Sequence, residues 1–223
     1  MIHVRRQTRR PDPAIVEAFR ELAVATVYEA SGRKGYIGNA VRPIAPGTRI
    51  CGPAYTVQCA PGDNLMLHKA LQRAATGDVL VAAAGEAYEY GYWGALMASA
   101  AVARKLGGLA IDACVRDSAE IRDMGFPLFC RGFCIRGTTK SVLGLINYPL
   151  NFSQMTIFPG DLVLGDDDGM VVVRLEECRA VLESALKRVS AEESKVKQLK
   201  AGVSSVELNS LDKVFETLGL SEE

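Results

Sequence analysis

The segment GALMASAAVARKLGGLAIDACVRDSAE, residues 94–120, decides the fold. Gly94 precedes a run of helix-forming residues from Ala95 to about Lys105, and Gly107-Gly108 ends it. Leu109–Ala113 follows as a mostly apolar run, which is typical of a strand buried on both faces. A helix followed at once by a buried strand indicates a sheet with crossover helices.

The same alternation extends on both sides of this segment. VLVAAA at 79–84 is a second buried apolar run, and LFC at 128–130 follows a short helix that ends near Asp123. Strand, helix, strand, helix, strand predicts a parallel core sheet and an α/β fold.

The flanking regions add helices at one end and hairpins at the other. We expect one helix over 11–30, a strand over 53–59, and a helix over 64–74 that Asp63 caps. After about residue 150, short strands broken by Pro159-Gly160 and Asp168-Gly169 predict antiparallel hairpins. The run Asp166–Gly169 is better explained as a hairpin turn than as a calcium loop, since Met170 replaces an oxygen ligand.

The C-terminal region predicts a different kind of structure. A long charged helix is expected over 175–200 with a narrow apolar stripe, followed by a second helix over 206–218. Such a helix buries little within its own domain. We therefore expect an α/β domain over residues 1–174 and a helical extension over 175–223 that packs on a neighbouring subunit.

Composition narrows the class of protein. The 223 residues are 48% hydrophobic and 23% charged, with 26 basic and 26 acidic residues and no net charge. This balance fits one globular domain and argues against nucleic-acid binding, which favours a basic excess. The sequence shows no membrane span and no secretory signal at Met1–Pro13, so we expect a cytoplasmic protein whose six cysteines are reduced.

Two features predict a binding crevice. Gly94 lets the backbone approach a ligand closely, and the helix after it presents the N–H groups of Ala95, Leu96 and Met97, which suit an anion. Arg116 and Asp117 lie just past the next strand. Because ligands of open α/β sheets bind at the carboxyl ends of strands, these groups should converge.

Arg116 suits a carboxylate or a developing oxyanion, and Asp117 suits a hard cation such as Mg²⁺. The residues alone leave open a second interpretation, in which this pair caps a helix or lies on the surface. The Walker A, G-x-G-x-x-G, G-x-S-x-G and H-E-x-x-H signatures are absent from the sequence.

The run from Gly94 through Asp117-Ser-Ala-Glu120 resembles the signature of the RraA-like family, which includes the class II 4-hydroxy-4-methyl-2-oxoglutarate / 4-carboxy-4-hydroxy-2-oxoadipate aldolases. Further matching motifs occur in the family's order over roughly residues 12–200: Pro61–Met66, Ile111-Asp112, Gly125–Pro127, Gly137–Lys140, Pro159–Asp161 and Asp166–Gly169.

The resemblance implies an α/β/α sandwich with a mixed central sheet, related to swivelling phosphohistidine domains, and assembly as homotrimers or homohexamers. Asp117 matches the single protein ligand of Mg²⁺ or Mn²⁺, and Arg116 matches the arginine that contacts the substrate oxygen. The amides of Gly94 to Met97 match those that hold the pyruvate carboxylate. Glu192 or Glu193 matches an acid that a neighbouring subunit's late helix contributes.

One position departs from the family pattern. Family aldolases carry Asp or Glu just after the glycine, where it hydrogen-bonds metal waters, and this chain has Ala95. Glu86 or Glu89, in the preceding loop, could replace that acid or could simply be exposed loop residues. The departure leaves open a reduced activity or a different oxo-acid substrate.

The resemblance thus implies a carbon–carbon lyase of aromatic-compound degradation that cleaves a small 4-hydroxy-2-oxo acid to pyruvate, with oxaloacetate decarboxylase side activity. Lys140 suits a distal carboxylate or a structural role better than a Schiff base. The alternatives are a regulator that binds and inhibits a ribonuclease, or a lyase for another oxo acid. Methyltransferase activity is rejected, because a glycine-rich nucleoside-binding turn is missing from the sequence.

Overall fold

The computed structural model describes residues 1–222, and a nine-stranded mixed sheet forms their centre. Its strands run in the order β1-β13-β12-β3-β4-β5-β7-β2, with β9 paired to β3. Their bounds are β1 (Tyr36–Ile37), β2 (Arg42–Pro43), β3 (Ile50–Gln58), β4 (Val79–Ala83), β5 (Gly108–Asp112), β7 (Leu128–Cys130), β9 (Leu145–Ile146), β12 (Leu162–Asp166) and β13 (Gly169–Val173).

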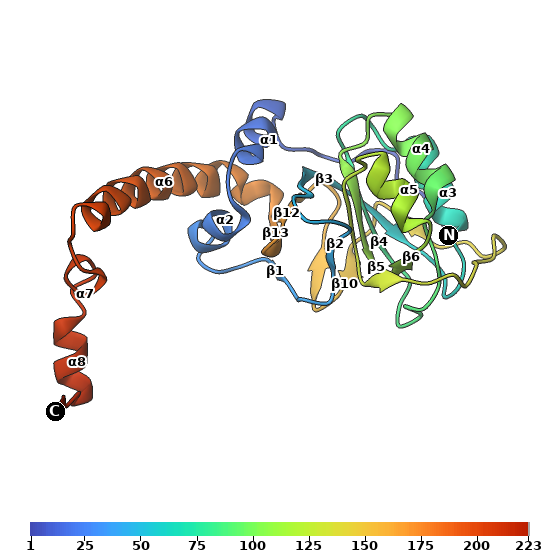
Figure 1. The fold of residues 1–223 in the computed structure, drawn as a ribbon. Helices are drawn as coiled ribbons and strands as arrows, with labels where there is room; N and C mark the ends of the chain where they lie inside the picture. Colours follow the sequence, from blue (N-terminus) through green and yellow to red (C-terminus); the bar gives the residue numbers. More distant parts are fainter. Residues whose placement is uncertain (223) are drawn as a thin grey trace.

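The parallel half of the sheet confirms the predicted βαβαβ unit and extends it by one strand. Strands β3, β4, β5 and β7 pair in parallel in that order. Every residue of β4 and β5 is buried, as the apolar runs require. The crossover helices lie side by side on one face (Figure 1): α3 (Leu65–Arg73), α4 (Ala95–Ala103) and α5 (Ser118–Asp123).

The antiparallel half confirms the predicted hairpins. Strands β12 and β13 form a hairpin whose turn closes where the Asp168 N–H donates to the Asp166 carboxylate at 3.1 Å. Two small sheets lie apart from the main one: β10 (Leu150–Phe152) pairs with β11 (Met155–Ile157), and β6 (Cys114–Val115) pairs with β8 (Gly132–Phe133). The fold is therefore α/β with a mixed sheet.

Two groups of helices cover one face of the curled sheet, one over its parallel half and the other over its antiparallel half. On β3, Tyr55 and Val57 face the core under α3 and α4, whereas Ile50 and Ala54 face an inner core that the sheet and the β10–β11 hairpin enclose. Figure 1 shows a second helical group beyond β12 and β13. Its members are α1 (Pro13–Arg20), α2 (Val24–Ala30), the 3₁₀ turn η1 (Leu175–Glu177) and the first turns of α6 (Cys178–Lys200).

Two predicted helices are each broken into two. The helix predicted over 11–30 divides into α1 and α2 because Ala23 is extended and the Val24 N–H donates to the Asp166 carboxylate at 2.9 Å. The helix predicted over 206–218 divides into α7 (Ser205–Leu208) and α8 (Asp212–Leu218), since Ser210 adopts a left-handed φ of 53°.

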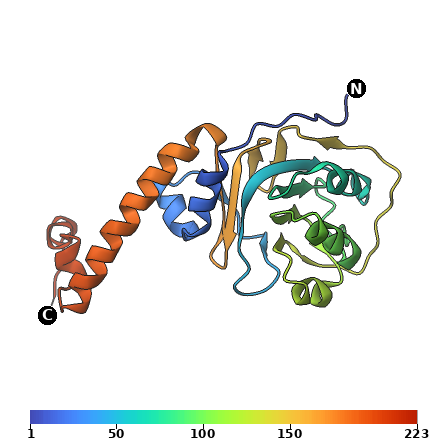
Figure 2. The same ribbon diagram turned by 90° about the horizontal axis from the view of Figure 1, so that it is seen from above.

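The long helix α6 belongs to the body of the chain only at its beginning. Cys178, Val181 and Ala185 are buried against α1 and α2, so part of the extension predicted from residue 175 packs within its own chain. Beyond Ala185 the helix projects away from the sheet (Figure 2), and Leu186 and Val196 are about half exposed. The packing of this projecting part on a neighbouring subunit stays a prediction.

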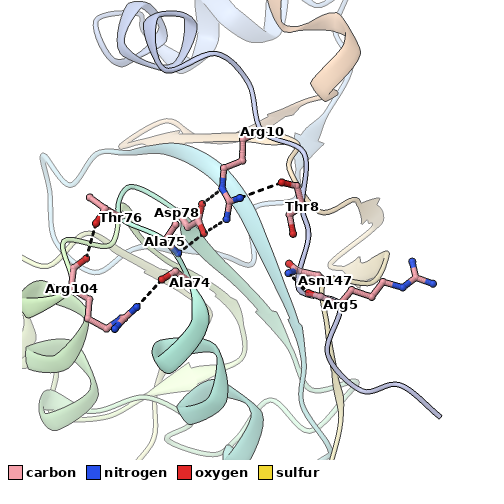
Figure 3. Close-up of polar contacts among 9 residues, drawn as sticks. All are labelled: Arg5, Thr8, Arg10, Ala74, Ala75, Thr76, Asp78, Arg104 and Asn147. Atoms are coloured by element: carbon pink, nitrogen blue, oxygen red, sulfur yellow. Dashed lines mark hydrogen bonds and ion pairs between the residues drawn. The ribbon is translucent and has the colours of Figure 1, made fainter.

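The N-terminal arm, residues 1–10, crosses the sheet region beside β9. Val4 bridges Ile146 in parallel, and the Arg5 N–H donates to the Ile146 carbonyl at 3.1 Å. The side-chain amide of Asn147 donates to the Arg5 carbonyl at 2.8 Å (Figure 3). The arm thereby completes the hydrogen bonding of β9, which is only two residues long.

An ion pair fixes the other end of the arm. The guanidinium of Arg10 donates to both oxygens of the Asp78 carboxylate at 2.8 Å (Figure 3). The Asp78 side chain is only 2% exposed and also accepts from the Ala75 N–H at 2.8 Å. Buried carboxylates need such partners, so this contact ties the arm to the turn before β4.

The remaining sequence expectations concern cysteines and membranes. All six cysteines are free thiols, and burial raises the pKa of the Cys59 and Cys130 thiols to about 12. Helices with the length and apolarity of a membrane span are absent from residues 1–222.

We predict that Arg10→Met destabilises the fold. It leaves the buried Asp78 carboxylate without its charged partner, which lowers the free energy of unfolding by about 1.5–3 kcal/mol. The matched control is Arg9→Met, because Arg9 makes only an exposed 3.8 Å pair with Glu176 and its loss changes stability by less than about 1 kcal/mol. Urea unfolding measures both, and equal effects would contradict the prediction.

Candidate active site

The carboxyl ends of β4 and β5 leave the sheet at the same edge, where Ala83 pairs with Asp112. The loops that follow these strands line a cavity of about 200 Å³. From the loop after β4 and the start of α4 come Gly91, Tyr92, Gly94, Leu96 and Met97, and from the loop after β5 come Arg116 and Asp117. The structure thus brings the two predicted features to one crevice.

A hydrogen bond between the two loops organises the crevice. The Asp117 carboxylate accepts from the Ala95 N–H, the first amide of α4, at 3.1 Å. Arg116 Nε lies 3.7 Å from the same carboxylate oxygen, and the Arg116 N–H donates to the Trp93 carbonyl at 2.9 Å. Both side chains remain partly open to solvent, at 49% and 38% exposure, so both can meet a ligand.

Glycine at position 94 is required by this close approach. A Cβ on Gly94 would lie 2.5 Å from the Asp117 carboxylate oxygen and 3.3 Å from Arg116 Nε. Asp117 itself adopts a left-handed φ of 55°, which Asp and Asn tolerate better than most residues. The backbone at Gly94 and at Asp117 therefore allows the Asp117 carboxylate to reach the first amide of α4.

The start of α4 offers fewer open amides than the sequence predicts. The Ala95 N–H is bonded to Asp117, and the Met97 N–H donates to the Gly94 carbonyl at 3.1 Å. Among the described residues, the Leu96 N–H has no acceptor, and Leu96 lines the cavity. Of the three helix amides, only that of Leu96 is available to an anion. The N–H of Gly94, just before the helix, also has no acceptor among the described residues and lines the cavity.

The cavity also has lining residues whose place the sequence did not reveal, Asn64 and His68. Asn64 donates from its side-chain amide to the Tyr92 carbonyl at 2.9 Å, and its buried Oδ1 has no partner among the described residues. His68 and Lys140 line the same cavity. Partial burial lowers the pKa of His68, and the charge of Lys140 lowers it further, so both favour the neutral ring.

Asn64 and His68 both belong to elements that the sequence identified for other reasons. Asn64 is part of the Pro61–Met66 motif, and His68 follows it on α3. The sequence signal that could have found them is their helical spacing of four residues, which puts both side chains on one face of the helix start.

The acidic residues predicted to assist lie elsewhere. Glu192 and Glu193 are on the projecting part of α6, at the opposite end of the molecule from α4 and α5 (Figure 1). Glu192 pairs with Arg188 of the same helix at 2.8 Å. Glu86 and Glu89 are exposed and are not among the residues that line the cavity. A single chain therefore brings only Asp117 among these acids to the crevice.

The donor set fits a hard divalent cation. Within residues 1–222, no three His, Cys, Asp or Glu side chains gather at one place, which disfavours zinc-type coordination. Asp117 presents a carboxylate in a cradle that a Cβ at Gly94 would fill. One carboxylate with several waters suits Mg²⁺ or Mn²⁺.

Comparisons with known proteins agree with this geometry. The RraA-like (Aldolase/RraA) family model matches residues 15–172. A Halalkalibacterium halodurans protein named "Putative 4-hydroxy-4-methyl-2-oxoglutarate aldolase" is 30% identical over 191 residues, which cover 86% of this chain and 91% of that protein.

Solved structures resemble the chain over most of its length. An uncharacterised Pseudomonas syringae protein superposes with a TM-score of 0.81 at 25% identity, covering 90% of this chain and 99% of that one. A Streptomyces coelicolor protein described as an unusual member of the RNase ES inhibitor RraA family has a TM-score of 0.75 at 26% identity, covering 85% and 98%. The chain belongs to the RraA-like family.

Proposed function

We propose that this chain is a divalent-metal-dependent lyase that cleaves a 4-hydroxy-2-oxo acid, such as 4-hydroxy-4-methyl-2-oxoglutarate or 4-carboxy-4-hydroxy-2-oxoadipate, to pyruvate and a second oxo acid. The observation that carries the proposal is the meeting of Arg116, Asp117 and the start of α4 at one cavity. The names of aldolase relatives support it.

Each positively charged or hydrogen-bond-donating group at the cavity has a different role in the proposed reaction. Arg116 stabilises the enolate oxygen that forms when the carbon–carbon bond breaks, because its planar guanidinium is fixed beside the cavity. The free N–H of Leu96, at the positive end of α4, binds the pyruvate carboxylate. Lys140, which also lines the cavity, suits a second carboxylate.

Asp117 holds the cation in this proposal. A bound Mg²⁺ or Mn²⁺ supplies Lewis-acid polarisation of the keto acid. The Ala95 N–H and Arg116 orient the Asp117 carboxylate toward the cavity. An enolate stabilised in this way would also form when oxaloacetate loses CO₂, so oxaloacetate decarboxylation is a side activity of the proposed enzyme.

The competing function is ribonuclease inhibition, which the likeness to the Streptomyces coelicolor protein favours. A pure inhibitor has no need of the Arg116–Asp117 pair at a cavity. A pyruvate-release assay over a panel of 4-hydroxy-2-oxo acids and oxaloacetate, with added Mg²⁺ and with EDTA, separates the two. Release that EDTA abolishes supports the lyase, and the absence of release from every substrate with Mg²⁺ or Mn²⁺ would sink it.

We predict that Asp117→Asn abolishes metal-stimulated turnover and leaves the fold intact. Asparagine tolerates the left-handed backbone at this position and can still accept from the Ala95 N–H, but it removes the charge that holds the cation. The control is Asp123→Asn, an exposed change at the end of α5. Thermal unfolding checks the fold, and Mg²⁺-dependent pyruvate release that stays at the unmutated level would refute the assignment.

We predict that Arg116→Lys lowers kcat on the order of 100-fold to 1000-fold, because lysine keeps the charge but loses the planar fork that spans two oxygens. The matched control is Arg122→Lys, since Arg122 lies exposed over Phe133 at 5.9 Å and does not line the cavity. Steady-state kinetics measure both variants. A loss below threefold for Arg116→Lys means that this side chain is structural.

The acids of α6 would act only in an assembled protein. Glu192 and Glu193 lie on the projecting half of α6, so in this proposal they reach the crevice of a neighbouring subunit and take over the part of the acid that Ala95 replaces. The site of one chain would then be completed by the next chain of a homotrimer or homohexamer.

We predict that replacing both Glu192 and Glu193 by Gln lowers kcat about 10-fold to 100-fold, while Glu183→Gln, exposed on the same helix, does not. Co-assembly of this double variant with Asp117→Asn should restore activity at about one site in four, since each chain then supplies what the other lacks. Activity of mixed oligomers is the measurement. An unrestored mixture contradicts the cross-subunit site.

A further inference from the structure

The segment over residues 137–144, here called the rim loop, forms one lip of the candidate active site. Gly137, Thr138 and Lys140 of this loop line the cavity. A Cβ on Gly137 would lie 3.9 Å from Arg116 Nη1, so the loop reaches the arginine at its first residue and carries Lys140 three residues later. Its backbone forms no helix and pairs only through a single bridge at Thr139.

The carboxylate of Asp63 fastens this loop from inside the protein. Its Oδ2 accepts from the Ser141 N–H at 2.6 Å, from the Thr139 hydroxyl at 2.8 Å and from the Val142 N–H at 3.2 Å. These donors lie on both sides of Lys140 in the sequence. One carboxylate oxygen therefore fixes the backbone that carries the lysine.

Asp63 also contacts the start of α3, although Asn64 and not Asp63 occupies the N-cap position there. Its other oxygen, Oδ1, accepts from the Leu65 N–H at 2.8 Å, which is the contact that the sequence predicts for a helix start. The residue is 1% exposed. Burial raises the pKa of Asp63, but the donors at Ser141, Leu65 and Thr139 lower it more, so the pKa stays below its usual value and the group remains charged.

The far end of the rim loop is held by the N-terminal arm. The His3 ring nitrogen Nδ1 lies 3.0 Å from the Gly144 carbonyl, and the Ile146 N–H donates to the His3 carbonyl at 2.8 Å. A Cβ on Gly144 would collide with the Gln58 carbonyl of β3, so the loop lies directly against the sheet there. Asp63 holds the loop at residues 139–142 and His3 holds it at Gly144, so the loop has little freedom to carry Lys140 away from the cavity.

We propose that Asp63 is a positioning residue: through Thr139, Ser141 and Val142 it holds Lys140 at the cavity, and so selects substrates that carry a second carboxylate. The inference rests on the proposed lyase function and adds to it the device that sets specificity. Arg116, the start of α4 and Lys140 all line the cavity. In the proposed function Arg116 and the start of α4 serve the pyruvate half of the substrate, and Lys140 serves the distal half.

Two reactions of the same enzyme distinguish binding of the pyruvate half of the substrate from binding of its distal half. Exchange of the pyruvate methyl protons in D₂O with Mg²⁺, followed by NMR, uses only the pyruvate half. Cleavage of the dicarboxylate 4-hydroxy-4-methyl-2-oxoglutarate uses both halves. The ratio of kcat/KM for cleavage to kcat/KM for exchange therefore reports on the distal carboxylate, and a general loss of structure lowers both terms of the ratio.

We predict that Asp63→Asn and Lys140→Met each lower this ratio on the order of tenfold, mainly through the KM for cleavage. The double variant should fall no further than Lys140→Met, because Asp63 acts through the lysine. Single effects that multiply in the double variant, or an unchanged ratio in Asp63→Asn, would overturn the proposal. Unmutated protein that neither exchanges nor cleaves overturns the proposed function itself.

A milder pair of variants covers the case in which Asp63→Asn does not fold. Thr139→Val is nearly isosteric and removes the 2.8 Å hydroxyl contact to Asp63, so the ratio should fall about threefold. Ser141→Ala removes only a 3.4 Å contact and keeps the strong backbone bond, so the ratio should not change. Equal ratios for the two variants count against the clamp.

Discussion

The hydrogen bond from the first amide of α4 to the Asp117 carboxylate is the contact on which the crevice depends. It joins the loop after β4 to the loop after β5, and it forms because parallel pairing brings the ends of these strands to one edge. The same bond aims Asp117 and keeps it 3.7 Å from Arg116 Nε. An acid, an arginine and a helix start thus form one unit, although a whole helix and strand separate Ala95 from Asp117 in the sequence.

Much of the fold could be predicted because its signals are local. The buried runs at 79–84 and 109–113, with glycines between them, are enough to indicate parallel strands and crossover helices. The break between α1 and α2 could not be predicted, because its cause is the carboxylate of Asp166, which is 142 residues away in sequence from Val24. Apolar spacing alone continues through that break.

The candidate active site likewise has residues that local sequence signals predict and residues that they do not. Gly94, Arg116 and Asp117 follow from strand-end reasoning, since each lies next to a predicted element boundary. The places of Asn64 and His68 at the cavity could not be predicted, and only the family resemblance indicates a role for Lys140. Long-range contacts, chief among them the bonds of Asp63 to residues 139–142, bring these segments together. The proposed roles of Glu192 and Glu193 require subunit contacts, which a single sequence does not encode in any local pattern.

The absent side chain at Gly94 also limits how a protein of this shape can change over generations. Any larger residue there collides with the Asp117 carboxylate, so position 94 and position 117 can vary only together. Leu96, two residues later, and Thr138 and Lys140 of the rim loop line the same cavity, and their side chains are not held by that contact. We therefore expect substitutions that change substrate choice at these two places rather than at the glycine, the arginine or the aspartate.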